Sequence, residues 1–233
     1  MTRPIRVAAF DLDGTLVDTM RFAPRVYADT VRQLGGPQLS ADDITRVWHM
    51  GSTDVVLGHF LNRSATRQDL DVYFIAFETA FRNVQPFPGV VAMLEDLHGF
   101  GLALGVFTTA TRRAATIMLE ASGLSTRLDG LVAGDEVKRP KPHPEGLERL
   151  CNALGTRSAA AVYTGDASVD LDCALAAGAI PIYAGWGQRE KPDPSPDRIA
   201  HTPSGVVDLI RALLVPWSPH SSIETSMLEA GQA

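Results

Sequence analysis

Two aspartates separated by one residue follow a short apolar segment near the start of the chain. Residues 7–10 are Val-Ala-Ala-Phe, a pattern typical of a buried strand, and they lead directly into Asp11 and Asp13. Carboxylates this close repel each other by about 4 kcal/mol in a partly buried cleft, so such a site favours a bound cation. Oxygen ligands of this kind suit Mg²⁺. The alternative is a solvated turn that simply ends the strand, because Gly14 allows the chain to turn sharply.

The chain from residue 89 onward alternates between segments typical of helices and segments typical of strands. We expect helices at residues 90–100, 112–122, 144–154, 168–177 and 204–214. We expect strands at residues 7–10, 102–107, 128–133, 159–163 and 179–184. This alternation predicts an α/β fold in which helices cover both faces of a parallel sheet. Residues 186–203 are expected to form a loop, and the tail 216–233 is expected to be mobile.

Polar residues follow several of the predicted strands. Thr108, Asp135 and Asp166 come after three of these segments, as Asp11 comes after the first. The carboxyl ends of parallel strands meet at one edge of a sheet, which is where open α/β folds hold their ligands. Residues far apart in the sequence are therefore expected to form one site at this edge.

The sequence between the first strand and residue 86 is expected to form helices. Ser40 and Asp43 have the spacing of a capping box at the start of one helix. Thr53 or Asp54 is expected to cap the next helix. A fourth helix has apolar and aromatic residues at helical spacing, which we expect to form a core rather than to line a substrate pocket. These residues are Leu70, Tyr73, Phe74, Phe77 and Phe81.

The composition is that of a soluble globular protein, with 45% hydrophobic and 21% charged residues among 233. The net charge of −6 argues against nucleic acid and anionic membranes as partners. No apolar segment approaches the length of a membrane span, and the first residues lack the pattern of an export signal. Cys151 and Cys173 are too few for a disulfide framework or a zinc site, so we expect reduced thiols. These features fit a cytoplasmic enzyme.

Four short motifs occur in a fixed order: Asp11-Leu-Asp13-Gly14-Thr15, Val106-Phe-Thr108-Thr109, Lys141-Pro-His-Pro144 and Gly165-Asp166-Ala-Ser-Val-Asp170. Together they resemble the haloacid dehalogenase-like hydrolase superfamily, over roughly residues 5–185. The segment after the first motif resembles the helical cap of phosphoglycolate phosphatase-like members. The resemblance implies a Rossmann-like doubly wound parallel sheet with an inserted all-helical cap. The core would comprise residues 1–17 and 86–215, and the cap residues 18–85.

The resemblance also implies a role for each motif residue. Asp11 would be the nucleophile that attacks phosphorus to form an aspartyl-phosphate. Asp13 would protonate the leaving alcohol and then activate water, while its backbone carbonyl faces the metal. Asp166 would bind Mg²⁺ together with Asp11. Asp170 would either orient this metal site or cap the helix that begins near residue 168. Lys141 would hold phosphate oxygens and offset their repulsion from Asp11.

Two neighbouring threonines are the other candidates for binding phosphate. The Thr108 hydroxyl would join Lys141 in holding phosphate oxygens. Many members of the superfamily carry Asn or Ser where Thr109 stands, so Thr108 is preferred to Thr109. Asp135 and Glu136 are expected to form an acidic loop surface or to lie outside the metal ligands.

Members of the superfamily catalyse several reactions, and this sequence argues against some of them. Dehalogenases lack the second acid of the first motif, so Asp13 favours phosphoryl chemistry. Phosphonate-cleaving relatives use a cap lysine, whereas residues 18–88 contain seven arginines and no lysine. Mutase-like relatives use a histidine soon after the first motif, and residues 21–24 contain none. They also use an arginine in a cap loop, and residues 49–54 contain none.

We therefore predict a Mg²⁺-dependent phosphatase that hydrolyses a small phosphate monoester such as phosphoglycolate or a sugar phosphate. The alternatives are β-phosphoglucomutase-like phosphoryl transfer and a non-catalytic binding module that retains the fold. The expected partner is a small phosphorylated metabolite, and the sequence leaves open a monomer or a homodimer. Candidates for contacting the leaving group are Arg21, Arg46, Gly51 and Ser52 in the cap.

Overall fold

The computed structural model describes residues 4–47, 50, 52–187 and 195–214 of the chain. Its centre is a six-stranded, all-parallel sheet with the order β3-β2-β1-β4-β5-β6. The strands are β1 (Val7–Phe10), β2 (Ala103–Phe107), β3 (Gly130–Val132), β4 (Ala161–Gly165), β5 (Ile180–Ala184) and β6 (Ile199–Ala200). Because β1 lies between β2 and β4, the residue that follows β1 emerges beside the ends of both neighbours.

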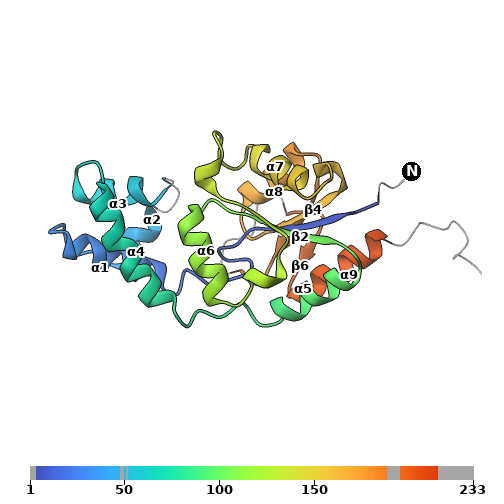
Figure 1. The fold of residues 1–233 in the computed structure, drawn as a ribbon, viewed down its shortest axis with the longest axis horizontal. Helices are drawn as coiled ribbons and strands as arrows, with labels where there is room; N and C mark the ends of the chain where they lie inside the picture. The colour runs from blue at the N-terminus through green and yellow to red at the C-terminus, as the bar shows by residue number, and fades with distance from the viewer. Residues whose placement is uncertain (1–3, 48–49, 51, 188–194, 215–233) are drawn as a thin grey trace, which may run out of the picture.

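Helices cover both faces of the sheet, as predicted for a doubly wound α/β fold (Figure 1). They are α5 (Val90–Gly99), α6 (Arg112–Ala121), α7 (Glu145–Ala153), α8 (Ser168–Ala176) and α9 (Pro203–Leu214). Ala8 and Phe10 of β1 pack with α5, α6 and α9 on one face. Val7 and Ala9 pack with α7 and α8 on the other. Successive residues of a strand point to opposite faces, so the apolar run of β1 serves two cores.

The first four of the described α-helices between β1 and β2 form a separate unit beside the sheet (Figure 1). They are α1 (Ala23–Gln33), α2 (Ala41–Arg46), α3 (Thr53–Leu61) and α4 (Arg67–Phe81). The connections into and out of this helical unit lie side by side, because Val17 and Pro86 form an antiparallel bridge. The Phe87 amide also donates to the Leu16 carbonyl at 3.0 Å. The domain bounds at residues 18 and 85 stay a prediction.

The helix starts of this unit agree with one prediction and correct another. Ser40 and Asp43 form the predicted capping box, in which the Asp43 amide donates to the Ser40 hydroxyl at 3.2 Å. For α3 the predicted cap, Thr53 or Asp54, is wrong. Ser52 is the N-cap, because its extended backbone places Thr53 in the first helical turn. The Ser52 hydroxyl donates to the Asp54 carboxylate instead of capping a backbone amide.

The aromatic residues of α4 form the core of the helical unit, which confirms that prediction. Tyr73, Phe74, Phe77 and Phe81 are each at most 5% exposed. The rings of Phe77 and Phe81 stack with their centroids 4.0 Å apart. The helical spacing of these residues therefore stabilises the unit by burying apolar surface.

In the described part of segment 186–203, which was predicted to be a loop, the structure has one short strand. Ile199 and Ala200 form β6, which pairs in parallel with the end of β5 at the edge of the sheet. A strand of two residues is too short to show an alternating pattern, so it could not be predicted from hydrophobic periodicity. The predicted mobile tail, 216–233, lies outside the described residues. Among the described helices, none has the length and apolar character that crossing a membrane requires.

Candidate active site

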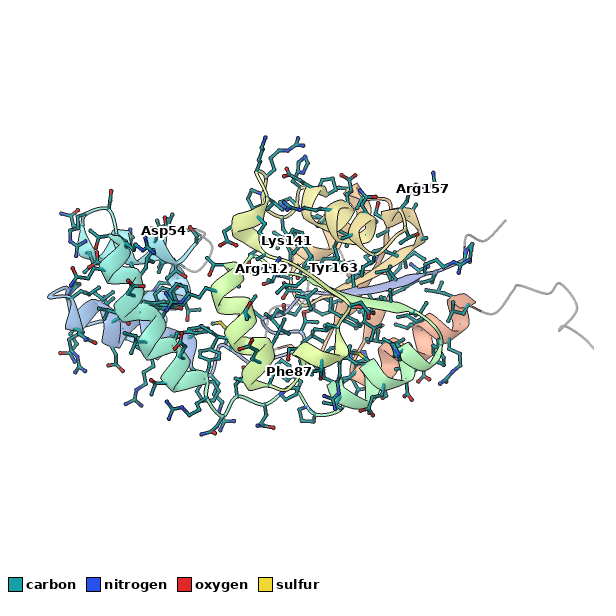
Figure 2. All side chains as sticks on the ribbon, in the orientation of Figure 1. Asp54, Phe87, Arg112, Lys141, Arg157 and Tyr163 are labelled. Atoms are coloured by element: carbon teal, nitrogen blue, oxygen red, sulfur yellow. The ribbon has the colours of Figure 1, made fainter. Side chains whose placement is uncertain are left out.

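A buried lysine connects two aspartates at the carboxyl edge of the sheet. The Lys141 Nζ lies 2.6 Å from Asp11 Oδ1 and 2.8 Å from Asp170 Oδ1. The Lys141 side chain is only 1% exposed. Its ammonium also lies over the rings of Phe107 and Tyr163, 4.9 and 5.2 Å from their centroids. Figure 2 shows Lys141 close to Tyr163, on the side of the sheet toward the helical unit.

The parallel strands β1 and β4 and the helix α8 position the three aspartates of this site. Asp11 directly follows β1, and its amide donates to the carbonyl of Thr164 in β4 at 2.8 Å. Asp166 directly follows β4 and is 2% exposed. Asp170 lies in the first turn of α8, where its Oδ2 accepts from the Ala167 amide at 3.0 Å. Asp170 therefore caps its helix with one oxygen and binds Lys141 with the other.

The carboxylates of Asp11, Asp166 and Asp170 could hold a metal ion. One oxygen from each lies within 4.8 Å of the other two, and all three residues are buried. The ligand atoms are all carboxylate oxygens, the donors that Mg²⁺ prefers. The donor set therefore fits the predicted cofactor. Asp13, also predicted to be a ligand, is half-buried beside this triad.

The electrostatics of the cluster also favour a bound cation. Burial raises the pKa of the Asp11 carboxyl well above its usual value, and the Lys141 charge opposes this shift. The negative charges of Asp170, Asp166 and Asp13 raise it further. Burial alone would lower the pKa of Lys141, but the charges of Asp11 and Asp170 outweigh it and raise the value. Four carboxylates face one ammonium, and a divalent cation would relieve this excess of negative charge.

Two glycines allow the backbone to approach the aspartates closely. Gly14 has a φ of +85°, and a Cβ there would lie 2.3 Å from Asp166 Oδ2. A Cβ on Gly165 would lie 2.4 Å from the Asp170 carboxylate. Neither position has room for a side chain, so the cluster depends on glycine at both.

The two threonines of the second motif lie at the end of β2, next to β1. Thr108 is fully buried, and its hydroxyl accepts a hydrogen bond from the Ala110 amide at 3.1 Å. This bond leaves the Thr108 O–H available to donate. Thr109 is exposed. The position of Thr108 suits the predicted phosphate contact better than that of Thr109, and both roles stay predictions.

The Asp13 carboxylate acts electrostatically on the helical unit. The pKa of Tyr27 is raised by burial and, to a smaller extent, by the charge of Asp13. The pKa of Tyr73 is raised in the same way. The Tyr27 hydroxyl donates to the Thr53 hydroxyl at 3.1 Å, so these cap residues form a buried polar cluster. The charge of Asp13 therefore acts both on Asp11 and on two buried tyrosines of the helical unit.

The cap residues predicted to contact substrate have varied surroundings. Arg21 is exposed, with its guanidinium 5.9 Å from the centre of the Phe22 ring. Arg46 forms an ion pair with Asp43 on its own helix at 2.8 Å. Ser52 occupies the N-cap position of α3 and its hydroxyl donates to Asp54, and Gly51 lies outside the described residues. Substrate contact by these four residues stays a prediction.

Asp135, which also follows a strand, is not part of the carboxylate cluster of Asp11, Asp166 and Asp170. Its Oδ1 accepts from the amide of Arg112 at 2.8 Å. The guanidinium of Arg112 forms an ion pair with Glu136 and donates to the Leu131 carbonyl at 2.8 Å. Asp135 and Glu136 therefore fasten the loop after β3 to α6.

One neighbour of the site was absent from the sequence prediction. The indole Nε1 of Trp186 donates to the carbonyl of Thr15 at 2.9 Å. Trp186 follows β5, and the same rule that groups the carboxyl ends of parallel strands could have identified it. An apolar residue in a predicted loop gave no chemical signal of its own.

Comparisons with known proteins agree with this fold and site. The model of the haloacid dehalogenase-like hydrolase family matches residues 8–184. The plasmid-encoded phosphoglycolate phosphatase of Cupriavidus necator is 36% identical over 200 residues, 79% of this chain and 84% of that protein. The probable phosphatase IndB of Dickeya dadantii is 32% identical over 215 residues, 88% of this chain and 93% of that protein.

A solved structure has the same fold. It is that of a predicted phosphoglycolate phosphatase from Haemophilus somnus 129pt, with a TM-score of 0.75 and 21% identity. The similarity covers 90% of this chain and 99% of that one. The chain belongs to the haloacid dehalogenase-like hydrolase family. The predicted class, a hydrolase of the phosphate monoester type, is confirmed.

Proposed function

We propose that the protein is a Mg²⁺-dependent phosphatase that hydrolyses a small phosphate monoester through a covalent intermediate on Asp11. The observation that carries this proposal is the buried cluster in which Lys141 binds Asp11 and Asp170. Asp166 adds a third carboxylate to this cluster. Buried charges of this density are rarely retained for stability, because desolvation offsets most of their attraction. Lys141 would bind a phosphoryl dianion at this site, and the carboxylates would bind a cation.

In the first half of the reaction, an Asp11 carboxylate oxygen attacks phosphorus and the bond to the leaving alcohol breaks. Asp13 donates its proton to that leaving oxygen. The charge of Lys141 opposes the rise that burial causes in the pKa of Asp11 and so favours the ionised nucleophile. Lys141 also donates hydrogen bonds to the phosphoryl oxygens. The Thr108 hydroxyl supplies a further hydrogen bond. The products are an aspartyl-phosphate on Asp11 and a free alcohol.

In the second half, the Asp13 carboxylate takes a proton from water as the water oxygen attacks phosphorus. The bond between phosphorus and the Asp11 oxygen breaks, which releases inorganic phosphate and regenerates both aspartates. The site is largely buried, so these interactions act with little screening by water. Asp13 therefore needs to be accessible from the substrate side, and its half-buried position supports this role.

Asp11, Asp166, Asp170 and the backbone carbonyl of Asp13 are the groups that we propose to hold Mg²⁺. The bound cation would neutralise negative charge on the phosphoryl oxygens and on Asp11 as they approach each other. The excess of carboxylates over ammonium at this site supports a divalent ion.

The substrate class is a small phosphorylated metabolite. Phosphoglycolate is the first candidate, because the relatives described above include phosphoglycolate phosphatases. Arg21, Arg46, Gly51 and Ser52 are proposed to face the leaving group, and a sugar phosphate is the second candidate. The cap would then determine specificity for the alcohol, and the residues at the carboxyl edge of the sheet would bind and transfer the phosphoryl group.

Hydrolysis of p-nitrophenyl phosphate in the presence and absence of Mg²⁺ tests this proposal. We expect turnover that requires Mg²⁺, and no turnover by the Asp11→Asn variant. Asp96→Asn is a matched control, because Asp96 is exposed near the end of α5, the helix that leads into the amino end of β2. A panel of metabolite phosphates would then rank the substrates. Wild-type protein inactive on every monoester would refute the enzyme assignment.

A further inference from the structure

Trp186 connects the end of β5 to the first motif. It lies two residues after the strand, and its indole N–H donates to the Thr15 carbonyl at 2.9 Å. Thr15 follows Gly14 in the turn that carries Asp13, and 171 residues separate it from Trp186. Trp186 is half-buried and packs against the apolar core. This hydrogen bond is therefore a tether between two segments that are distant in the sequence.

The residue after Trp186 lies against the metal triad. A Cβ on Gly187 would lie 2.7 Å from the Asp166 Cβ and 2.8 Å from the Gly14 carbonyl oxygen. A Cβ on Gly14 would lie 2.3 Å from Asp166 Oδ2. The Asp166 side chain is thus packed closely against the backbone of both glycines. A side chain at either glycine would displace it.

We propose that Trp186 and Gly187 are positioning residues that hold the Asp13–Thr15 turn against Asp166 and so preorganise the Mg²⁺ site. This inference rests on the proposed function, because it assumes that Asp166 and the Asp13 carbonyl bind the cation. Trp186 and Gly187 act through Thr15, Gly14 and Asp166.

The physical reason for a tether is the freedom of the turn itself. Gly14 has a φ of +85°, in a region that glycine enters and leaves easily. A flexible turn would have to be ordered each time the cation binds, which weakens binding. The Trp186 hydrogen bond fixes the carbonyl next to this glycine in advance. Groups that orient metal ligands in this way typically contribute a factor of about 10 to 100 in metal affinity or activity.

Calorimetric titration of the substrate-free protein with MgCl₂ tests the inference without using activity. We expect Trp186→Phe, which keeps an aromatic ring but removes the N–H donor, to bind Mg²⁺ about 10-fold more weakly than wild type. Its kcat at saturating Mg²⁺ should remain within about 3-fold of wild type, because it leaves the reacting groups in place. A merely structural role would lower the Tm but would not move the Mg²⁺ affinity in this selective way.

Gly187→Ala provides a second variant that leaves the indole intact. The φ of Gly187 lies outside the left-handed region, so alanine tests the close approach to Asp166 rather than backbone strain. We expect weaker Mg²⁺ binding here as well. Gly99→Ala is the control, because a Cβ there would meet nothing within 4 Å. Wild-type Mg²⁺ affinity in both Trp186→Phe and Gly187→Ala would overturn the inference. Wild-type protein that binds no Mg²⁺ would instead refute the proposed function.

Discussion

Ion pairs at the carboxyl edge of the sheet differ from those on the helical unit in burial and in sequence separation. Lys141 is 1% exposed, and its partners Asp11 and Asp170 are 130 and 29 residues away. On the helical unit, Arg46 is 73% exposed and pairs with Asp43, three residues earlier on the same helix. The first arrangement exists only in the complete fold, whereas the second can form in an isolated helix.

This difference indicates where the chemistry is concentrated. Exposed pairs within one helix contribute about 0.3–0.5 kcal/mol each and are screened by salt. Buried charges at the sheet edge are desolvated, so removing one leaves the others without compensation. We therefore expect substitutions at the sheet edge to abolish activity, and substitutions on the helical unit to change substrate affinity or stability by modest amounts. The following predictions test that contrast, from the largest expected effect to the smallest.

Among the variants that keep the Asp11 nucleophile, the largest loss of turnover is expected from Asp13→Asn. The asparagine can neither protonate the leaving alcohol nor activate water, which together we expect to lower kcat by about 10⁴-fold. Steady-state hydrolysis of p-nitrophenyl phosphate measures this loss. Asp18→Asn is a control, because Asp18 follows the same motif and is half-exposed. Full activity of Asp13→Asn would exclude Asp13 as the acid and base.

Lys141→Ala is expected to lower kcat/KM by about 10³-fold, because it removes a donor to the phosphoryl oxygens. It should also destabilise the metal-free protein by about 3–5 kcal/mol, since two buried carboxylates lose their partner. Urea unfolding without Mg²⁺ measures the second effect. Lys138→Ala is the control, because Lys138 is exposed in the same loop. If Lys141→Ala had wild-type activity, the buried charges at the carboxyl edge of the sheet would not be needed for turnover. The expected contrast between this edge and the helical unit would then be refuted.

Arg113 connects the two regions and should give an intermediate effect. Located on α6, it pairs with Asp71 and Glu78 of α4 at 3.1 and 3.5 Å. Its guanidinium also lies 4.3 Å from the centre of the Phe74 ring. Together these partly exposed contacts stabilise the packing of α4 against α6 by about 1–2 kcal/mol. We expect Arg113→Ala to raise KM by up to about 10-fold while leaving kcat within about 2-fold.

The salt dependence of KM sharpens this prediction. Because exposed ion pairs are screened, high salt should raise KM in wild type but have less effect in Arg113→Ala. Arg82→Ala, at the exposed end of α4, should behave like wild type. If KM had the same value and salt dependence in all three proteins, Arg113 would have no role in holding the helical unit.

Asp69→Asn should change stability with little effect on activity. The Asp69 carboxylate binds Arg63 at 2.9 Å and the Thr66 amide at 2.7 Å, in a capping box at the start of α4. The hydrogen bond from Arg63, followed by that from Thr66, holds the pKa of Asp69 well below its usual value. Loss of this cap should destabilise the protein by about 1–2 kcal/mol at pH 7.

The pH dependence of this effect has a definite sign. A carboxyl whose pKa is lowered by folding stabilises the folded state above its unfolded pKa of about 4, and this contribution is lost as the pH falls. The difference in unfolding free energy between wild type and Asp69→Asn should therefore narrow below about pH 4. Urea unfolding at several pH values measures it. If the difference in unfolding free energy were the same at every pH, the ionised Asp69 carboxylate would not be the group that stabilises the start of α4.

Features of the fold and of the site that depend on short motifs or on local spacing could be predicted from the sequence. The rule for parallel sheets was enough to group Asp11 and Asp166, which directly follow β1 and β4. Lys141 and Asp170 do not directly follow strands, and the resemblance of their motifs to the superfamily was needed to place them in the same site. The capping box at Ser40 and the aromatic core of α4 depend on local spacing, which is also readable from sequence.

Features that depend on tertiary placement were not predictable in this way. The Trp186 hydrogen bond to Thr15 joins two backbone segments that only the folded sheet brings together. β6 exists because β5 offers it an edge, and Arg113 meets α4 only after the helical unit has folded. The N-cap of α3 was shifted by one residue, which is within the usual uncertainty of helix boundaries.

The most direct test of the account is to locate covalent phosphate on the Asp13→Asn variant. This variant should form the aspartyl-phosphate but hydrolyse it slowly, so that it accumulates with an activated phosphate ester and Mg²⁺. Acid quenching, proteolysis and mass spectrometry would identify the modified peptide. We predict phosphate on the peptide that contains Asp11, and none in the Asp11→Asn/Asp13→Asn double variant. Phosphate on another residue, or turnover by wild type without any covalent intermediate, would contradict the account.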